Sequence, residues 1–142
     1  MGLQISWYAD YRVLYLNVVD NIQSDEAAMV AKQIINELDD SPFGTVHILV
    51  DARAMLNTSL NTHLLSTVIA PLFLQKMVGW MCFFGDAVAH NNTLDESVNP
   101  LFRNRYKIFD TGEDAIQYLR QNDRSLKNLL PLSEFDTQVE IA

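Results

Sequence analysis

The sequence predicts an α/β fold in which a mostly parallel sheet of about five strands is flanked by helices. The first observation is a short apolar run at residues 46–50, rich in β-branched side chains, which begins after Gly44 and ends at Asp51. Such runs are typical of strands that are buried on both faces of a parallel sheet. The second observation is that strand-like and helical patterns alternate in the order β-β-α-β-α-β-α-β-α. We therefore expect residues 46–50 to form the central strand.

The N-terminal third predicts a hairpin followed by a helix. Residues 3–8 and 12–19 are typical of strands joined by a short link, so the first strand should lie antiparallel at an edge of the sheet. The second strand has a more continuous apolar face, predicted to point to the core, which consists of Leu14, Leu16 and Val18. Ser24 is the predicted N-cap of the following helix. The apolar face of this helix consists of Ala27, Val30, Ala31, Ile34, Ile35 and Leu38.

The middle of the chain predicts a helix on each side of another buried strand. The first helix should begin near residues 58–61, and Pro71 should kink or end it because proline has no N–H to donate. Residues 79–84 predict the strand. Residues 93–102 are helical by pattern, although Pro100 interrupts them.

The C-terminal part predicts a last strand and a last clear helix. Residues 106–110 form the strand, and Thr111 should cap the helix that follows. The inward side of this helix consists of Ala115, Ile116 and Leu119. We expect residues 1–124 to form a single domain and residues 125–142 to form an irregular C-terminal extension, because its apolar residues show no clean period.

Composition and charge limit the classes of function. The chain of 142 residues has a formal net charge of −8, which repels phosphate backbones, so nucleic acid is not an expected partner. Pro71 and several polar residues interrupt the longest apolar region, residues 64–84, so we expect no membrane-spanning segment. The N-terminus has no signal-like pattern, and the single Cys82 lies in an apolar run, which predicts a buried and inert thiol. These features predict a cytoplasmic protein.

Four predicted strands end in a carboxylate, and the residues are Asp20, Asp51, Asp86 and Asp110. Because the carboxyl ends of parallel strands meet at one edge of a sheet, we expect these side chains to lie at the same edge. An acidic edge is the minimum that a Mg²⁺-dependent phosphoryl-transfer enzyme requires. His90, in a polar loop after Asp86, is the best candidate for a general base in such an enzyme.

A second interpretation of these aspartates is structural, because Asp is common where strands turn into loops and its side chain binds nearby backbone N–H groups. The motifs favour this interpretation. Asp51-Ala52-Arg53 lacks the second Asp that the haloacid-type phosphatase signature places two residues after the first. The sequence also has no P-loop and no nucleophile-elbow motif. We therefore predict no bound metal and no cofactor.

The order of elements and the C-terminal motif resemble those of the STAS and SpoIIAA-like domains, which are anti-sigma-factor antagonists and their relatives. The last strand and helix of these domains commonly run from a basic residue through hydrophobic residues and Phe to acidic residues, Ala and Leu. Here the matching segment is Tyr106-Lys107-Ile108-Phe109-Asp110, followed by a helix with Ala115 and Leu119. The resemblance covers residues 3–122. It implies a regulatory or protein-binding module without enzymatic activity.

In this family a Ser or Thr in the loop after the central strand is phosphorylated by a partner kinase. The nearest stretch here is Asn57-Thr58-Ser59-Leu60, which has neither the Asp nor the Gly of the family's loop. Thr58 and Ser59 therefore have two interpretations, a phosphorylation switch or simple caps of the next helix. Together with Arg53 they form the predicted partner-binding site.

Two further hypotheses come from apolar side chains. The first is a small apolar-ligand carrier, motivated by the residues around Pro71, which are Leu60, Leu64, Leu65, Leu72, Phe73 and Met77. The second is a homodimer formed through the predicted edge strand, where Trp7 and Tyr8 lie close to only Asp10 and Arg12 as charged residues.

Overall fold

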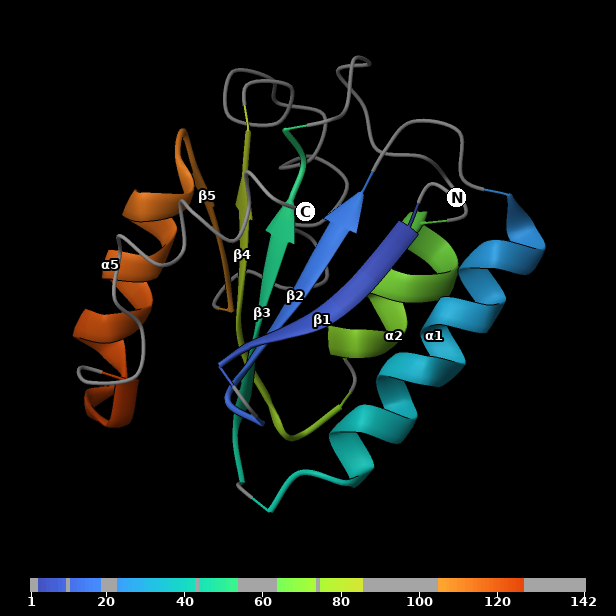
Figure 1. Ribbon diagram of the computed structural model, residues 1–142, viewed down its shortest axis with the longest axis horizontal. Coiled ribbons are helices and arrows are strands. Elements are labelled where there is room, and N and C mark those ends of the chain that lie inside the picture. Colours follow the sequence, from blue (N-terminus) through green and yellow to red (C-terminus); the bar gives the residue numbers. More distant parts are fainter. Residues whose placement is uncertain are drawn as a thin grey trace.

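The computed structural model describes residues 3–9, 11–18, 23–42, 44–53, 64–73, 75–85 and 105–126. The strands are β1 (Leu3–Ala9), β2 (Val13–Val18), β3 (Val46–Asp51), β4 (Val78–Phe84) and β5 (Tyr106–Phe109). They form one sheet in the order β1-β2-β3-β4-β5, in which β1 is antiparallel to β2 and all other neighbours are parallel. The α/β class, the central position of β3 and the antiparallel edge strand are therefore confirmed (Figure 1).

Helices cover both faces of the sheet. Helix α1 (Ser24–Asp39) and the short α2 (Ala70–Phe73) lie on one face, and α5 (Gly112–Asn122) lies on the other (Figure 1). A π-helical turn at Leu64–Ile69 leads into α2, and a 3₁₀ turn at Arg124–Leu126 follows α5. Among the helices that the structure describes, none is long and apolar enough to cross a membrane.

Two hydrophobic clusters fill the spaces between the sheet and these helices. The cluster under α1 and α2 includes Leu14, Leu16, Val18, Ala27, Val30, Ile34, Leu38, Ile48, Val50, Met81 and Phe83. The cluster under α5 includes Val13, Tyr15, Leu49, Cys82, Phe84, Ala115, Ile116, Leu119 and Leu126. The predicted core faces of β2 and α5 are confirmed, and so is that of α1 at Ala27, Val30, Ile34 and Leu38, whereas Ala31 and Ile35 are only half-buried. On the opposite face of β2, Val13 and Tyr15 are buried as well, as part of the second cluster.

The two helix N-termini differ in how well the sequence predicted them. Thr111 is the N-cap of α5 as predicted, and its hydroxyl accepts a hydrogen bond of 3.2 Å from the Asp114 N–H. The predicted cap at Ser24 is wrong by one residue. Gln23 has extended backbone angles and accepts the first helical hydrogen bond from Ala27, so Ser24 already lies inside the helix.

The helix around Pro71 confirms part of the prediction. The backbone changes from π-helical to α-helical geometry one residue before Pro71, and α2 ends at Phe73. Proline disrupts the regular ladder because it has no N–H, and π-turns commonly accompany such disruptions. The predicted start of this helix, the helix at residues 93–102 and residues 127–142 lie outside the described residues.

The double burial of β3 predicts a large penalty for shortening one of its side chains. Leu49 is 0% exposed, so Leu49→Ala should lower the free energy of unfolding by about 2–5 kcal/mol through lost burial and a cavity. Urea unfolding measures this change. The control is Gln33→Ala at an exposed position of α1, which should change the free energy by less than about 0.5 kcal/mol. Equal effects of both substitutions would contradict this assignment of the core.

Candidate functional site

The carboxyl end of β3 holds an ion pair between Asp51 and Arg53. The Asp51 carboxylate is buried, with 3% exposure, and accepts hydrogen bonds from the Tyr15 hydroxyl and the Arg53 backbone N–H. The Arg53 side chain adds bonds from Nε, at 3.1 and 3.3 Å, and from Nη2, at 3.0 Å. A carboxylate has about four lone-pair sites. The acceptor capacity of Asp51 is therefore used within the protein.

The pKa values of Tyr15 and Arg53 keep their hydrogen bonds to Asp51 intact at neutral pH. Burial and the hydrogen bond to Asp51 both raise the pKa of Tyr15, so its hydroxyl stays protonated and donates. Burial lowers the pKa of Arg53, but the hydrogen bond and the charge of Asp51 outweigh it, so the pKa is raised. The guanidinium therefore stays charged.

Two further contacts fix the position of Arg53. Its guanidinium carbon lies 5.4 Å from the centre of the Phe84 ring. The backbone beneath it is tightly packed, because the Ala52 N–H donates to the Phe84 carbonyl at 2.9 Å and Gly85 lies directly against Ala52 and Arg53. A Cβ on Gly85 would lie 2.8 Å from the Ala52 carbonyl carbon, and its φ of +129° also requires glycine. The side chain of Arg53 is nevertheless 43% exposed.

The structure brings two of the four predicted aspartates to this edge. Asp51 pairs with Phe84 and Phe84 pairs with Phe109, so Asp110 follows at the same edge, two strands away and exposed. In the part of the chain that the structure describes, no three His, Cys, Asp or Glu residues are placed to hold a metal ion. The other predicted site residues lie outside the described ranges, and they are Asp20, Thr58, Ser59, Asp86 and His90.

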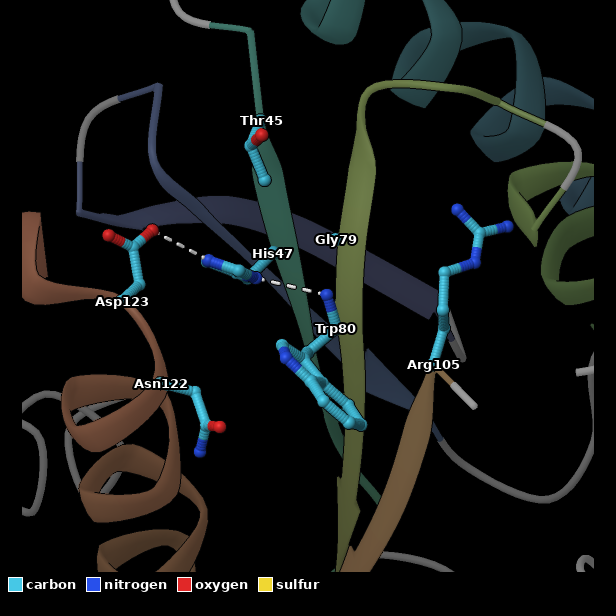
Figure 2. Close-up of a pocket in the computed structure, with 7 residues that line it drawn as sticks. All are labelled: Thr45, His47, Gly79, Trp80, Arg105, Asn122 and Asp123. Carbon is cyan, nitrogen blue, oxygen red and sulfur yellow. Dashed lines mark hydrogen bonds and ion pairs between the residues drawn. The ribbon is translucent and has the colours of Figure 1, made fainter. Parts of the chain in front are cut away.

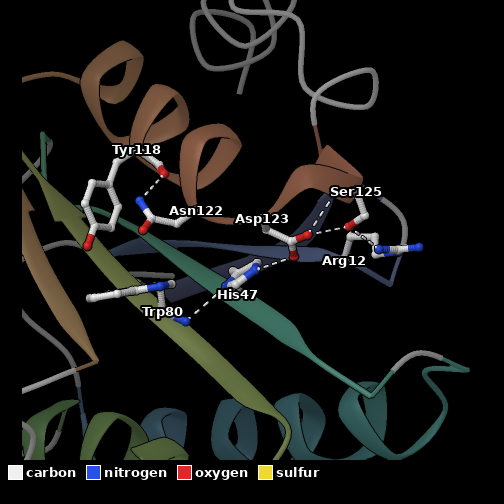
Figure 3. Close-up of polar contacts among 7 residues, drawn as sticks. All are labelled: Arg12, His47, Trp80, Tyr118, Asn122, Asp123 and Ser125. Carbon is white, nitrogen blue, oxygen red and sulfur yellow. Dashed lines mark hydrogen bonds and ion pairs between the residues drawn. The ribbon is translucent and has the colours of Figure 1, made fainter.

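A second polar cluster lies at the amino end of the sheet, around His47 (Figure 3). Val46 pairs with Val78 and Ile48 pairs with Met81, so β4 has one extra residue here, which is a β-bulge opposite His47. The Trp80 backbone N–H in this bulge donates to His47 Nδ1 at 3.0 Å. Because a backbone N–H can only donate, we assign the imidazole proton to Nε2, which lies 2.9 Å from Asp123 Oδ2.

Asp123 connects His47 to the end of α5 and to the turn before β2. Its other carboxylate oxygen accepts from the Ser125 N–H at 3.0 Å and from the Ser125 hydroxyl at 2.7 Å. Arg12 in turn donates to the Ser125 hydroxyl (Figure 3). Burial raises the pKa of Asp123, but the hydrogen bonds from Ser125 and His47 outweigh it and hold the pKa below its ordinary value. The cluster therefore ties β2, β3, β4 and α5 together.

This cluster contains Ser, His and Asp but has a different order from a catalytic triad. In a triad the histidine lies between the nucleophile and the carboxylate. Here Ser125 contacts Asp123 on the side away from His47, and both ring nitrogens of His47 are engaged within the fold. These contacts indicate a structural role for His47.

An open hollow of about 390 Å³ lies beside this cluster (Figure 2). It is lined by Thr45, His47, Gly79, Trp80, Arg105, Asn122 and Asp123. Sequence reasoning missed it, because its residues come from three strands and a helix end that are far apart in the chain. The sequence signal that could have indicated this cluster is a histidine within an apolar strand, because buried polar side chains are generally hydrogen-bonded.

Two other sequence predictions concern single side chains. Cys82 is fully buried, and burial raises the pKa of its thiol to about 12, so it is a neutral thiol at physiological pH. Trp7 is engaged with α1, since its indole N–H donates to Glu37 at 2.9 Å and its ring lies 5.2 Å from that of Tyr11. Tyr8 packs partly against the cluster under α5. Dimerisation through this strand stays a prediction.

Gly79 provides the space for the His47 ring, which generates a direct test. A Cβ at this position would lie 2.6 Å from His47 Nδ1 and 2.8 Å from Thr45 Cγ2. Gly79→Ala should therefore displace the ring from the Trp80 N–H and lower the free energy of unfolding by about 1–3 kcal/mol. Urea unfolding measures the loss. The matched control is Gly44→Ala, where a Cβ meets nothing within 4 Å and little change is expected.

The lowered pKa of Asp123 predicts a pH dependence of stability. A carboxylate with a lower pKa in the folded state contributes stability above its unfolded pKa, near 3.8, and this contribution disappears as the pH falls through the folded pKa. Asp123→Asn should therefore destabilise the protein at neutral pH, and its difference from wild type should shrink below about pH 4. Urea unfolding between pH 3 and pH 7 measures both curves. A constant difference over this range would show that Asp123 titrates normally.

Comparison with known proteins adds no identification. No family model matches the chain, and no curated protein matches it either. The resemblance to the STAS and SpoIIAA-like domains rests on the residue pattern and the order of elements. It stays a prediction, and what it implies about function belongs to the proposal that follows.

Proposed function

We propose that this protein is a regulatory module without enzymatic activity, which binds a partner protein at the carboxyl edge of its sheet, around Arg53. The resemblance to the STAS and SpoIIAA-like domains implies this class of function, and a cytoplasmic location is part of the proposal. The single observation that carries the proposal is the fixed and half-exposed guanidinium of Arg53 at the end of the central strand.

The geometry of Arg53 suits recognition of an acidic group. Asp51 occupies the Nε and Nη2 side of the guanidinium, whereas Nη1 donates no hydrogen bond to any described residue. An arginine fork matches carboxylate and phosphate oxygens. Asp51 and the Phe84 ring already hold the side chain in place, so its binding costs little additional rotamer entropy. The expected contact on the partner is therefore a carboxylate or phosphate group.

The net charge of the chain indicates which charge the rest of the partner surface should carry. A net charge of −8 attracts basic surfaces over long distances and accelerates their association. The partner should therefore combine a basic surface with one acidic group opposite Arg53. Thr58 and Ser59 follow Arg53 in the sequence, and a phosphate on either would add close to two negative charges to this region. Such a phosphate would repel the acidic group of the partner and compete with it for the Arg53 guanidinium, so phosphorylation should weaken the contact at Arg53.

The side chains that most often perform chemistry are engaged elsewhere in the described part of the fold. His47 uses both ring nitrogens, Asp51 accepts from Tyr15 and Arg53, and Cys82 is buried as a neutral thiol. These engagements support a binding function. They disfavour a magnesium site at Asp51, because a metal ion would have to displace Arg53 and Tyr15 from its carboxylate.

Removal of the Arg53 fork tests this proposal. A partner is first captured from the native host with the wild-type protein and identified by mass spectrometry, and its Kd is then measured by calorimetry. Arg53→Gln should weaken this binding by about tenfold or more, the loss typical of a central charged contact. Lys76→Gln removes one exposed charge elsewhere and should leave the Kd unchanged.

A second variant separates binding from folding. Arg53→Gln leaves the buried Asp51 without its ion-pair partner, so it destabilises the protein as well. Asp51→Asn with Arg53→Gln keeps the net charge of the chain and avoids the unpaired buried carboxylate. This double variant should lose the partner to the same extent. Wild-type affinity in both variants would overturn the proposal.

A further inference from the structure

Strand β1 forms one edge of the sheet, and within the described part of the chain no further strand pairs with its outer side (Figure 1). Its residues include no charged residue and no proline, which edge strands commonly carry as protection against pairing with other chains. The β-bulge between Trp7 and Ala9 lies at the end of the strand, so the segment Leu3–Trp7 pairs regularly with β2. We propose that this segment, the dimer edge, pairs antiparallel with the same segment of a second copy of the chain.

The directions of the backbone groups show which residues are available at the dimer edge. In a sheet, the N–H and C=O groups of successive residues point alternately to the two neighbouring strands. The Arg12 carbonyl accepts from the His47 N–H on β3 at 2.9 Å, so the odd-numbered residues of β2 point to β1 instead. They are paired with even-numbered residues of β1. The outward backbone groups of the dimer edge are therefore those of Leu3, Ile5 and Trp7.

A two-fold axis at Ile5 gives the dimer edge a self-complementary register. Ile5 then lies opposite Ile5 of the second copy, and Leu3 lies opposite Trp7, so these residues form the hydrogen-bonded pairs. Gln4 lies opposite Ser6. Ile5 and Trp7 pack partly against the cluster under α1, whereas Gln4 and Ser6 are exposed and point to the other face of the sheet. Residues of like polarity meet in this register, which favours a second copy as the partner.

Contacts within the protein hold the dimer edge in place before association. The Trp7 indole N–H donates to Glu37 on α1 at 2.9 Å, and the Trp7 ring lies 5.2 Å from that of Tyr11. The inner side of the segment is bound to β2. Because the strand is already ordered, pairing adds backbone hydrogen bonds at a small cost in conformational entropy.

Charge opposes this association at long range but not at the contact itself. Each copy carries a net charge of −8, so two copies repel each other at low ionic strength. The dimer edge brings no charged side chain to the interface. Salt screens the long-range repulsion and leaves the backbone pairing in place, so the dimer should become stronger as the salt concentration rises.

Sedimentation velocity of the whole chain tests the dimer directly. At high micromolar concentration the wild-type protein should sediment as a dimer in equilibrium with monomer. The dimer fraction should be larger in about 0.5 M NaCl than in about 0.05 M NaCl, because the Debye length falls with salt concentration.

The exposed positions Gln4 and Ser6 test the register. Gln4→Glu with Ser6→Glu places like charges opposite each other across the interface, and so does Gln4→Lys with Ser6→Lys. Each double variant alone should associate about tenfold more weakly than wild type in the higher salt. An equimolar mixture of the two double variants pairs carboxylates with ammonium groups, so it should restore association as a heterodimer.

A matched control separates the register from the total charge. Gln117→Glu with Gln121→Glu adds two carboxylates at exposed positions of α5, which packs on the other hydrophobic cluster, and should associate like wild type in the higher salt. Urea unfolding verifies that all variants are folded. The proposal is overturned if wild type stays monomeric at both salt concentrations, if the double glutamate variant at positions 4 and 6 associates like wild type, or if the mixture does not restore association.

Discussion

The burial of β3 on both faces is the constraint on which the rest of this structure depends. Every residue of the strand is buried, yet two of its side chains, His47 and Asp51, are polar. A buried polar group without a hydrogen bond costs on the order of 1–3 kcal/mol, and a buried charge costs more. The fold therefore has to bring partners to both ends of the strand. Both candidate sites arise from this requirement.

The two ends of β4 show how the neighbouring backbone adapts to these polar groups. Gly79 lies opposite His47, and Gly85 lies against the turn that carries Arg53. A side chain at Gly79 would collide with the imidazole, and one at Gly85 would collide with the backbone of Ala52 and Arg53. Each glycine permits a close approach, so that the polar group on β3 reaches its donors. The β-bulge at Gly79 serves the same purpose, because it directs the Trp80 N–H to His47.

The sequence predicts the features that depend on local patterns. Apolar periodicity identified the central strand, the core face of α1 and the inward side of α5, and the cap at Thr111 followed from its position before a helical pattern. The wrong N-cap at Ser24 also comes from a local pattern, because Ser is a preferred capping residue but Gln23 takes the position without a side-chain hydrogen bond. The burial of Val13 and Tyr15 was missed because the other members of their cluster, from Leu49 to Leu126, are remote in the sequence.

The two candidate sites also differ in how far they depend on local sequence patterns. Asp51 and Arg53 are two residues apart, so their position after the central strand was predictable, although the ion pair between them was not. His47 and Asp123 are 76 residues apart, and nothing in the local pattern around either residue indicates the other. The hollow depends on this distant contact and on a bulge, which has no reliable sequence signal. Only the three-dimensional arrangement reveals it.

The rigidity of β3 makes the two candidate sites separable. His47 and Asp51, the ion-pair partner of Arg53, lie on the same face of β3, four residues apart, which is about 13 Å of extended chain. Substitutions separated by more than about 10 Å without shared partners are usually additive. The partners of His47 are Trp80 and Asp123, whereas those of Arg53 are Asp51 and Phe84, so no partner is shared. A loss of partner binding at the carboxyl edge should therefore leave the hollow beside His47 intact, so the two sites can be tested by separate measurements.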